Sequence, residues 1–171
     1  MYARLRPYHL IGAIGGFLTV LTAIISLAVS TSYYISAEWV IIVNMLLIGS
    51  NGLIATYFFG AFSASRDSLI KVGSLIAGIG LGFNVLISIL QMAGVYVFVL
   101  ALLGALVMMA EVVIACIKFI MLFQRDAFVV VFCVFIFLGL LLSLFWTWAS
   151  LISGAGLGGL LIYFYVHNIT Y

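Results

Sequence analysis

The sequence predicts an all-α integral membrane protein with six transmembrane helices, arranged as three consecutive hairpins with the N-terminus inside. The first observation is composition. Of the 171 residues, 68% are hydrophobic and 6% are charged, whereas a soluble domain carries about 25% charged residues. The second is the placement of the six basic residues, which are Arg4 and Arg6, Arg66 and Lys71, and Lys118 and Arg125. A pair of apolar runs separates each cluster from the next, so all three clusters lie on one face of the bilayer, as the positive-inside rule requires.

Composition also limits the domain organisation. A helix needs about 20 apolar residues to cross the hydrocarbon core, so six helices use about 120 residues and leave only short links. We therefore expect one transmembrane helical-bundle domain over residues 1–171, surrounded by lipid. The basic loops and both termini are expected on the cytoplasmic side of a cell membrane. The net charge of +2 serves this orientation, and nucleic-acid binding would need a much denser basic patch.

The first hairpin follows the basic start of the chain. Its first span is predicted over about His9–Val29, after Pro7, which a helix tolerates in its first turn. An outside link over 30–38 leads to Trp39, an aromatic residue suited to the membrane interface. The second span is predicted over about Trp39–Ala61.

The second hairpin begins after an inside loop that contains Arg66 and Asp67. Span three is predicted over about Lys71–Gln91 and span four over about Val95–Phe119. Gly94 lies between them and permits a tight outside turn. A second Arg-Asp pair, Arg125 and Asp126, follows span four 59 residues after the first. This spacing leaves open a duplication of like-oriented hairpins.

The third hairpin is the least certain from pattern alone, because residues 127–166 contain no charged side chain. One helix of that length would be about 60 Å long, twice the hydrocarbon thickness, so the segment must fold back. Trp146 and Trp148 favour a turn near residue 147, with spans over about 127–145 and 151–166. The alternative places the break in the glycine cluster Gly154–Gly159 and leaves five spans.

Small residues recur on several predicted spans. Helices in lipid associate through such residues, because they let two backbones approach closely. We expect helix packing at Gly12 and Gly16, at Ser74, Gly78 and Gly82, and at Gly154 and Gly158.

Glu111 is the main functional candidate, because it is the one acid that the topology does not explain. It lies seven residues before Lys118, about 10 Å along a helix and therefore inside the apolar run. An acid there is costly to ionise and is by default a functional hypothesis, such as a proton or cation site. The alternatives are a neutral Glu111 that hydrogen-bonds a neighbouring helix, or an ion pair with Lys118.

Two amides accompany this acid near the middle of their spans, Asn51 and Asn84. If they converge with Glu111, they form a polar site able to bind a proton-carrying water or a cation. The alternative is that each amide forms an interhelical hydrogen bond, worth around 1 kcal/mol.

The histidines and cysteines give weaker indications of a functional site. His9 and His167 both map to the inside end of a span, where they form a low-ranked pair of haem ligands. No cofactor is otherwise predicted, and no spacing suits a metal site. Cys116 and Cys133 are expected as small buried hydrophobic residues.

One short resemblance concerns Glu111. The segment 109–114, Met-Ala-Glu-Val-Val-Ile, resembles the acid-bearing helix of rotary-ATPase proteolipids. Gly78, Gly80 and Gly82 are similar to the glycine-rich partner helix of that family. The likeness implies a proton- or sodium-carrying carboxylate at Glu111. It covers one hairpin, lacks the family's polar loop at Gln91–Val95 and is followed by two further spans, so the chain is not assigned to the family.

Two functions follow as expectations. The first is a non-catalytic multi-pass subunit that packs within or scaffolds a larger membrane assembly, such as a respiratory or energy-transducing complex, with other subunits or further copies as partners. The alternative is a small proton- or cation-coupled transporter or channel centred on Glu111. The sequence contains no catalytic motif, which argues against an enzyme acting alone.

Overall fold

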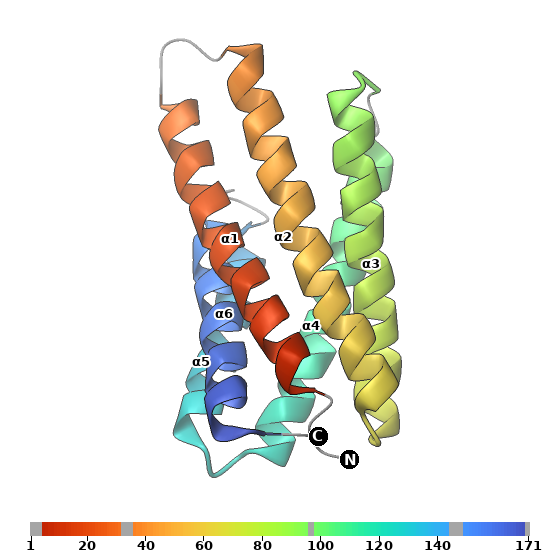
Figure 1. Cartoon of the computed structure of the whole chain (residues 1–171), viewed down its shortest axis with the longest axis vertical. Helices are drawn as coiled ribbons and strands as arrows, with labels where there is room; N and C mark the ends of the chain where they lie inside the picture. The colour runs from red at the N-terminus through yellow and green to blue at the C-terminus, as the bar shows by residue number, and fades with distance from the viewer. Residues whose placement is uncertain (1–4, 32–35, 96–97, 144–148, 170–171) are drawn as a thin grey trace.

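The computed structural model describes residues 5–31, 36–95, 98–143 and 149–169. Within these residues the chain forms six helices and no strand (Figure 1). The helices are α1 (Arg6–Ser30), α2 (Ala37–Ala64), α3 (Ser68–Met92), α4 (Phe98–Leu122), α5 (Ala127–Ser143) and α6 (Ser150–His167). The predicted all-α class is confirmed for this part of the chain.

Four helices, α1, α2, α3 and α6, are long and apolar enough to cross a membrane, which fits an integral membrane protein. Shorter apolar stretches are Val112–Leu122 within α4 and the whole of α5.

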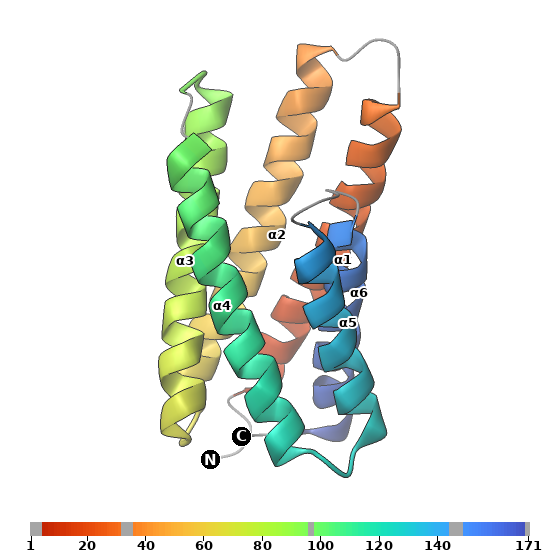
Figure 2. The ribbon, with the colours of Figure 1, turned by 180° about the vertical axis from the view of Figure 1, so that it is seen from behind.

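The helices form a closed ring. Each helix packs chiefly against its neighbour in the sequence, and α6 packs against α1 to close the circle. Successive helices run in opposite directions, so both termini and the α2–α3 and α4–α5 links lie at the same end (Figures 1 and 2). We call this the basic end, because it carries the described basic residues, which are Arg6, Arg66, Lys71, Lys118 and Arg125.

The helices of the ring differ in length. α5 and α6 have 17 and 18 residues, whereas the other helices have 25 to 28. At 1.5 Å per residue, α5 and α6 are about 26 Å long and the others about 40 Å. All six begin or end near the basic end, so α5 and α6 stop short of the opposite end (Figure 1).

Two aspartates fix where helices begin at the basic end. The Oδ1 atom of Asp67 accepts hydrogen bonds from the backbone N–H groups of Leu69 and Ile70, at 2.9 and 3.1 Å. Asp126 Oδ1 accepts in the same way from Phe128 and Val129 at the start of α5. Each carboxylate thus satisfies N–H groups that the first turn leaves unpaired.

Glycine ends α3 as predicted. Gly94 has a φ of 79°, a conformation that glycine adopts without steric cost. The N–H groups of Gly94 and Val95 donate to the carbonyls of Gln91 and Leu90. This pair of bonds is a Schellman motif, which closes the last turn of a helix.

The structure describes a continuous helix through the glycine cluster of the third hairpin. α5 ends at Ser143 and α6 begins at Ser150, and the glycines at 154–159 lie inside α6. A break within the glycine cluster is therefore wrong. Trp146 and Trp148, on which the predicted turn rests, lie outside the described residues, and the number of membrane spans stays a prediction.

Large side chains fill the ring near the basic end. Tyr57 and Phe164 are at most 1% exposed, and the rings of Phe119 and Phe164 are 5.5 Å apart. We call Tyr57, Phe119 and Phe164 the aromatic plug. Cys116 and Cys133 are buried beside it as free thiols. The plug packs within the main apolar core, so the interior of the ring is closed on this side.

Candidate functional site: a cavity inside the helix ring

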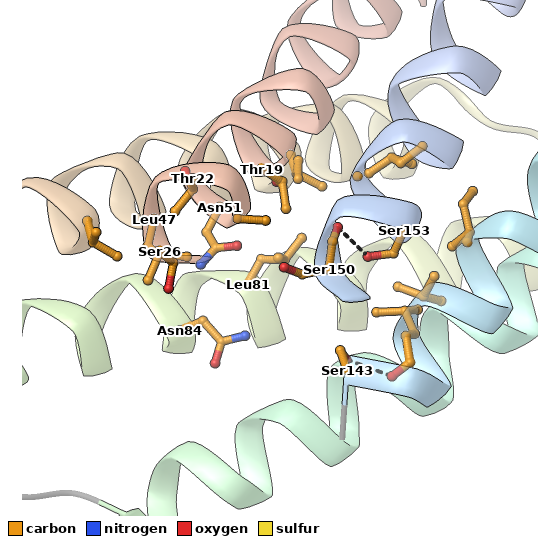
Figure 3. A pocket seen from close by; sticks show the side chains of 18 of the residues that line it. Thr19, Thr22, Ser26, Leu47, Asn51, Leu81, Asn84, Ser143, Ser150 and Ser153 are labelled. Atoms are coloured by element: carbon orange, nitrogen blue, oxygen red, sulfur yellow. Dashed lines mark hydrogen bonds between the residues drawn. The ribbon is translucent and has the colours of Figure 1, made fainter. Parts of the chain in front are cut away.

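A cavity of about 400 Å³ occupies the ring beyond the plug. This volume is within the range of ligand pockets, about 300–1,000 Å³. All six helices contribute lining residues, and Figure 3 shows the lining side chains converging on a common space. The polar lining residues are Thr19, Thr22 and Ser26 of α1, Asn51 of α2, Asn84 of α3, Ser143 of α5, and Ser150 and Ser153 of α6.

Four helices place an apolar residue at the inner limit of the cavity. On α2, α3, α5 and α6 the lining residue nearest the basic end is apolar: Phe58, Leu81, Ile136 and Leu157. The polar residues of these four helices lie farther from the basic end, towards the ends of α5 and α6. We call the four apolar residues the floor and the eight polar residues the wall.

Four of the six wall hydroxyls donate hydrogen bonds within their own helices. Thr19 and Thr22 donate to the carbonyls of Gly15 and Leu18, at 3.1 and 2.8 Å. Ser143 and Ser153 donate to Leu140 and Ser150, at 2.7 and 3.0 Å (Figure 3). Since each donor is already engaged, the oxygens of these hydroxyls are available to the cavity as acceptors.

The two predicted amides meet in this cavity. Asn51 and Asn84 lie on different helices and both line it, and Figure 3 shows their side chains projecting into the same space. A side chain at Gly104 of α4 would place its Cβ 3.4 Å from Asn84 Oδ1, so the amide packs close to α4. Each amide carries donors as well as an acceptor, whereas the four engaged hydroxyls offer only acceptors.

Glu111 belongs to α4, but its side chain lies outside the described residues. It directly precedes Val112, which lines the cavity. Lys118, its suggested ion-pair partner, has its Nζ 3.2 Å from Asp67 Oδ2. The proton- or cation-site hypothesis for Glu111 and the alternative ion pair with Lys118 both stay predictions.

The two histidines have different environments. His9 is 1% exposed, and its ring lies 5.9 Å from that of Tyr57 and 5.6 Å from that of Phe164. His167 is exposed, and its ring lies 4.2 Å from that of Tyr163. No cluster of three or more metal-binding side chains occurs among the described residues. Haem binding by this pair remains an untested prediction.

Most of the small residues named from the sequence lie at helix contacts. A Cβ on Gly16 would be 2.7 Å from Gly158 N, and one on Gly154 would be 2.8 Å from Gly16 O. Gly12 faces Leu161 and Tyr57, and Ser74 is buried. Gly78 faces the ring of Phe59. Gly82 differs: it is exposed, and a Cβ there would have no described atom within 4 Å.

Polar contacts tie helices together at the basic end. The Lys118–Asp67 ion pair joins α4 to the start of α3. Tyr163 of α6 donates to Asp126 Oδ2 at 2.6 Å, and the Arg6 guanidinium lies 4.7 Å from the ring centre of Tyr165. The pKa of Asp67 is lowered, first by the hydrogen bond from the Ile70 N–H and further by Lys118.

Six of the wall residues were not predicted from the sequence as site residues. They are the threonines and serines of α1, α5 and α6. A signal was present, because α1 carries hydroxyls at 19, 22 and 26, a spacing that keeps them on one helix face. Isolated serine and threonine are common in membrane helices, where they bond to their own backbone. Only the ring arrangement shows that these faces meet.

Comparison with known proteins gives no further assignment: no family, curated protein or solved structure matches this chain.

Proposed function

We propose that this protein is a small membrane transporter or channel whose solute passes through the helix ring. The observation that carries the proposal is the cavity of about 400 Å³, lined by polar side chains from five helices in a chain of otherwise apolar helices. Polar groups inside a membrane bundle are costly, so a cluster of them around an open space favours a solute path over simple helix packing.

In this proposal all six helices cross the membrane and the basic end faces the cytoplasm, following the positive-inside rule. The cavity then faces the outer half of the bilayer and reaches the ends of α5 and α6, while the aromatic plug closes the cytoplasmic half. Transport requires that the plug and the cavity mouth open at different times. Among the described residues the α4–α5 contact is the least extensive in the ring, so we place such an opening there.

Glu111 is the proposed coupling residue. It stands next to the lining residue Val112, and a carboxyl group within a span is suited to carrying a proton because its neutral form is tolerated in an apolar setting. Proton release to one side and uptake from the other would then accompany solute movement.

The test uses proteoliposomes that contain a pH-sensitive dye and purified protein. Addition of solute should move protons across the membrane with the wild-type protein. The Glu111→Gln variant should lose this coupled movement and keep the wild-type unfolding temperature. The matched control is Gln91→Glu, which adds an acid at the exposed end of α3 and should leave the flux unchanged. Unchanged proton movement in Glu111→Gln would overturn the coupling role.

A second candidate is a non-catalytic subunit of a larger membrane assembly. The observation in its favour is the exposed surface of α5, on which Phe128, Phe135 and Phe137 are 64%, 45% and 41% exposed. Such a surface packs against lipid or against another helix. Purification from native membranes in a mild detergent should recover stoichiometric partners if this candidate is correct, whereas a protein that is purified alone and is active in liposomes argues against it.

A further inference from the structure

We infer that the cavity binds an uncharged amphiphilic molecule, with its apolar end on the floor and a hydroxyl or amide head against the wall. The inference rests on the proposed function and specifies its substrate class. It depends on three properties of the cavity: the absence of charge in the described lining, the acceptors of the wall, and the apolar residues that four helices place at its inner limit.

The first property disfavours ionic ligands. No described residue that lines the cavity is charged. An ion that leaves water must be compensated by an opposite charge or by a dense set of hydrogen bonds. The nearest described ion pair, Lys118–Asp67, lies at the basic end, beyond the plug. A neutral molecule enters without this penalty.

The second property selects the head group. Thr19, Thr22, Ser143 and Ser153 use their own protons within their helices and present acceptors. A ligand head that donates hydrogen bonds, such as a hydroxyl or an amide N–H, meets these acceptors. Asn51 adds amide donors, so the head can also accept.

The third property selects the rest of the molecule. Phe58, Leu81, Ile136 and Leu157 form a floor without polar side chains. Water on this floor loses hydrogen bonds, so an apolar group gains by displacing it. The volume of about 400 Å³ corresponds to about a dozen water molecules in the liquid, which is sufficient for a single aromatic ring with a short polar arm.

The test measures equilibrium binding to the full-length protein in nanodiscs, with empty nanodiscs as the blank. The probes are 2-phenylethanol, ethylbenzene, phenylacetate and glycerol. Ethylbenzene lacks the head, phenylacetate is charged, and glycerol lacks the apolar end. We expect 2-phenylethanol to bind at least tenfold more tightly than each of the other three. Equal or tighter binding of any one of them overturns the inference.

A matched pair of variants locates the binding site. Thr22→Val removes one wall hydroxyl with little change of shape, and we expect it to weaken 2-phenylethanol binding at least threefold. The control is Thr56→Val: Thr56 donates to Gly52 O at 2.8 Å, as Thr22 does to Leu18 O, but is exposed on the outside of the ring. Equal effects of the two variants would contradict the assigned site.

Binding and transport can fail separately. Selective binding of 2-phenylethanol without flux supports the site and rejects the transport proposal. Coupled flux of some other solute, together with no selective binding of 2-phenylethanol, supports transport and overturns the assigned substrate class.

Discussion

At the scale of single residues, the charged side chains do more than orient the chain. Asp67 and Asp126 each follow an arginine, which suggests loop solvation, but both cap the helix that follows. The signal was present in the sequence, since aspartate before an apolar run is a preferred helix start. The ion pair of Asp67 with Lys118 had no such signal, because 51 residues separate them and only the α3–α4 packing brings them together.

Asp67 predicts a dependence of stability on pH. Its pKa is lowered in the folded protein, chiefly by the N–H of Ile70, so the folded state favours the ionised carboxylate. This stabilisation is fully present above the unfolded pKa of about 3.9 and is lost as the pH falls through the lower folded pKa. The unfolding temperature should therefore drop in this acidic range, and it should drop less in Asp67→Asn.

A second variant separates two causes of the lowered pKa of Asp67, the backbone hydrogen bond and the ion pair. Lys118→Met removes the ion pair but keeps the hydrogen bonds from Leu69 and Ile70 to Asp67. It should retain most of the acid-induced drop, because the backbone bond is the larger cause. Complete loss of the drop in Lys118→Met would show that the ion pair, and not the helix cap, sets the pKa.

At the scale of helices, the predicted and observed helix limits agree within a few residues. The small residues that were predicted to pack are not all buried. Residues four apart on a helix drift by about 40° per step, because one turn holds 3.6 residues. The stripe Ser74, Gly78, Gly82 therefore rotates by about 80° from its first to its last member. Ser74 and Gly78 are buried and Gly82 is exposed, as this drift requires.

The α1–α6 contact gives a prediction at this scale. At Gly16 an added methyl group would meet the backbone of Gly154 and Gly158, which cannot move aside as a flexible side chain can. We expect Gly16→Ala to destabilise the protein by about 1–3 kcal/mol, a typical cost of overpacking. Gly82→Ala is the control: it should be neutral or stabilising by up to about 1 kcal/mol, because alanine favours a helix. Thermal unfolding in detergent measures both, and equal effects would contradict the contact.

At the scale of the whole molecule, the ring is closed at one end and hollow at the other. The plug and the floor lie in the basic half, and the wall reaches the ends of α5 and α6. The cause is the distribution of side-chain size: the basic halves of α2, α4 and α6 carry large aromatic residues, whereas the hollow part is lined partly by serine, threonine and glycine.

The aromatic plug gives a prediction at the scale of the whole molecule. Phe164 is fully buried in contact with the ring of Phe119. Phe164→Ala should cost about 3–5 kcal/mol, the usual range for a buried aromatic residue. If the protein transports solute as proposed, it should also increase uncoupled leak of a neutral solute from proteoliposomes, because the cavity then extends towards the basic end. The control is Phe137→Ala at an exposed position of α5, and this variant should not increase solute leak. Equal solute leak from the two variants would reject the plug as a barrier.

The sequence by itself determined the class, the approximate helix limits and the placement of both termini at one end. These are consequences of one-dimensional quantities: the length of apolar runs, which predicts helices because a lipid environment would leave backbone groups no other partner, and the order of charges between them. Only the tertiary structure decided which faces meet. The helices are apolar nearly all round, so hydropathy leaves their rotation undetermined, and ring closure by α6 against α1 is a property of all six helices together. The cavity and the burial of His9 against Phe164 depend on that closure, whereas the pairing of Lys118 with Asp67 depends on the packing of α3 against α4.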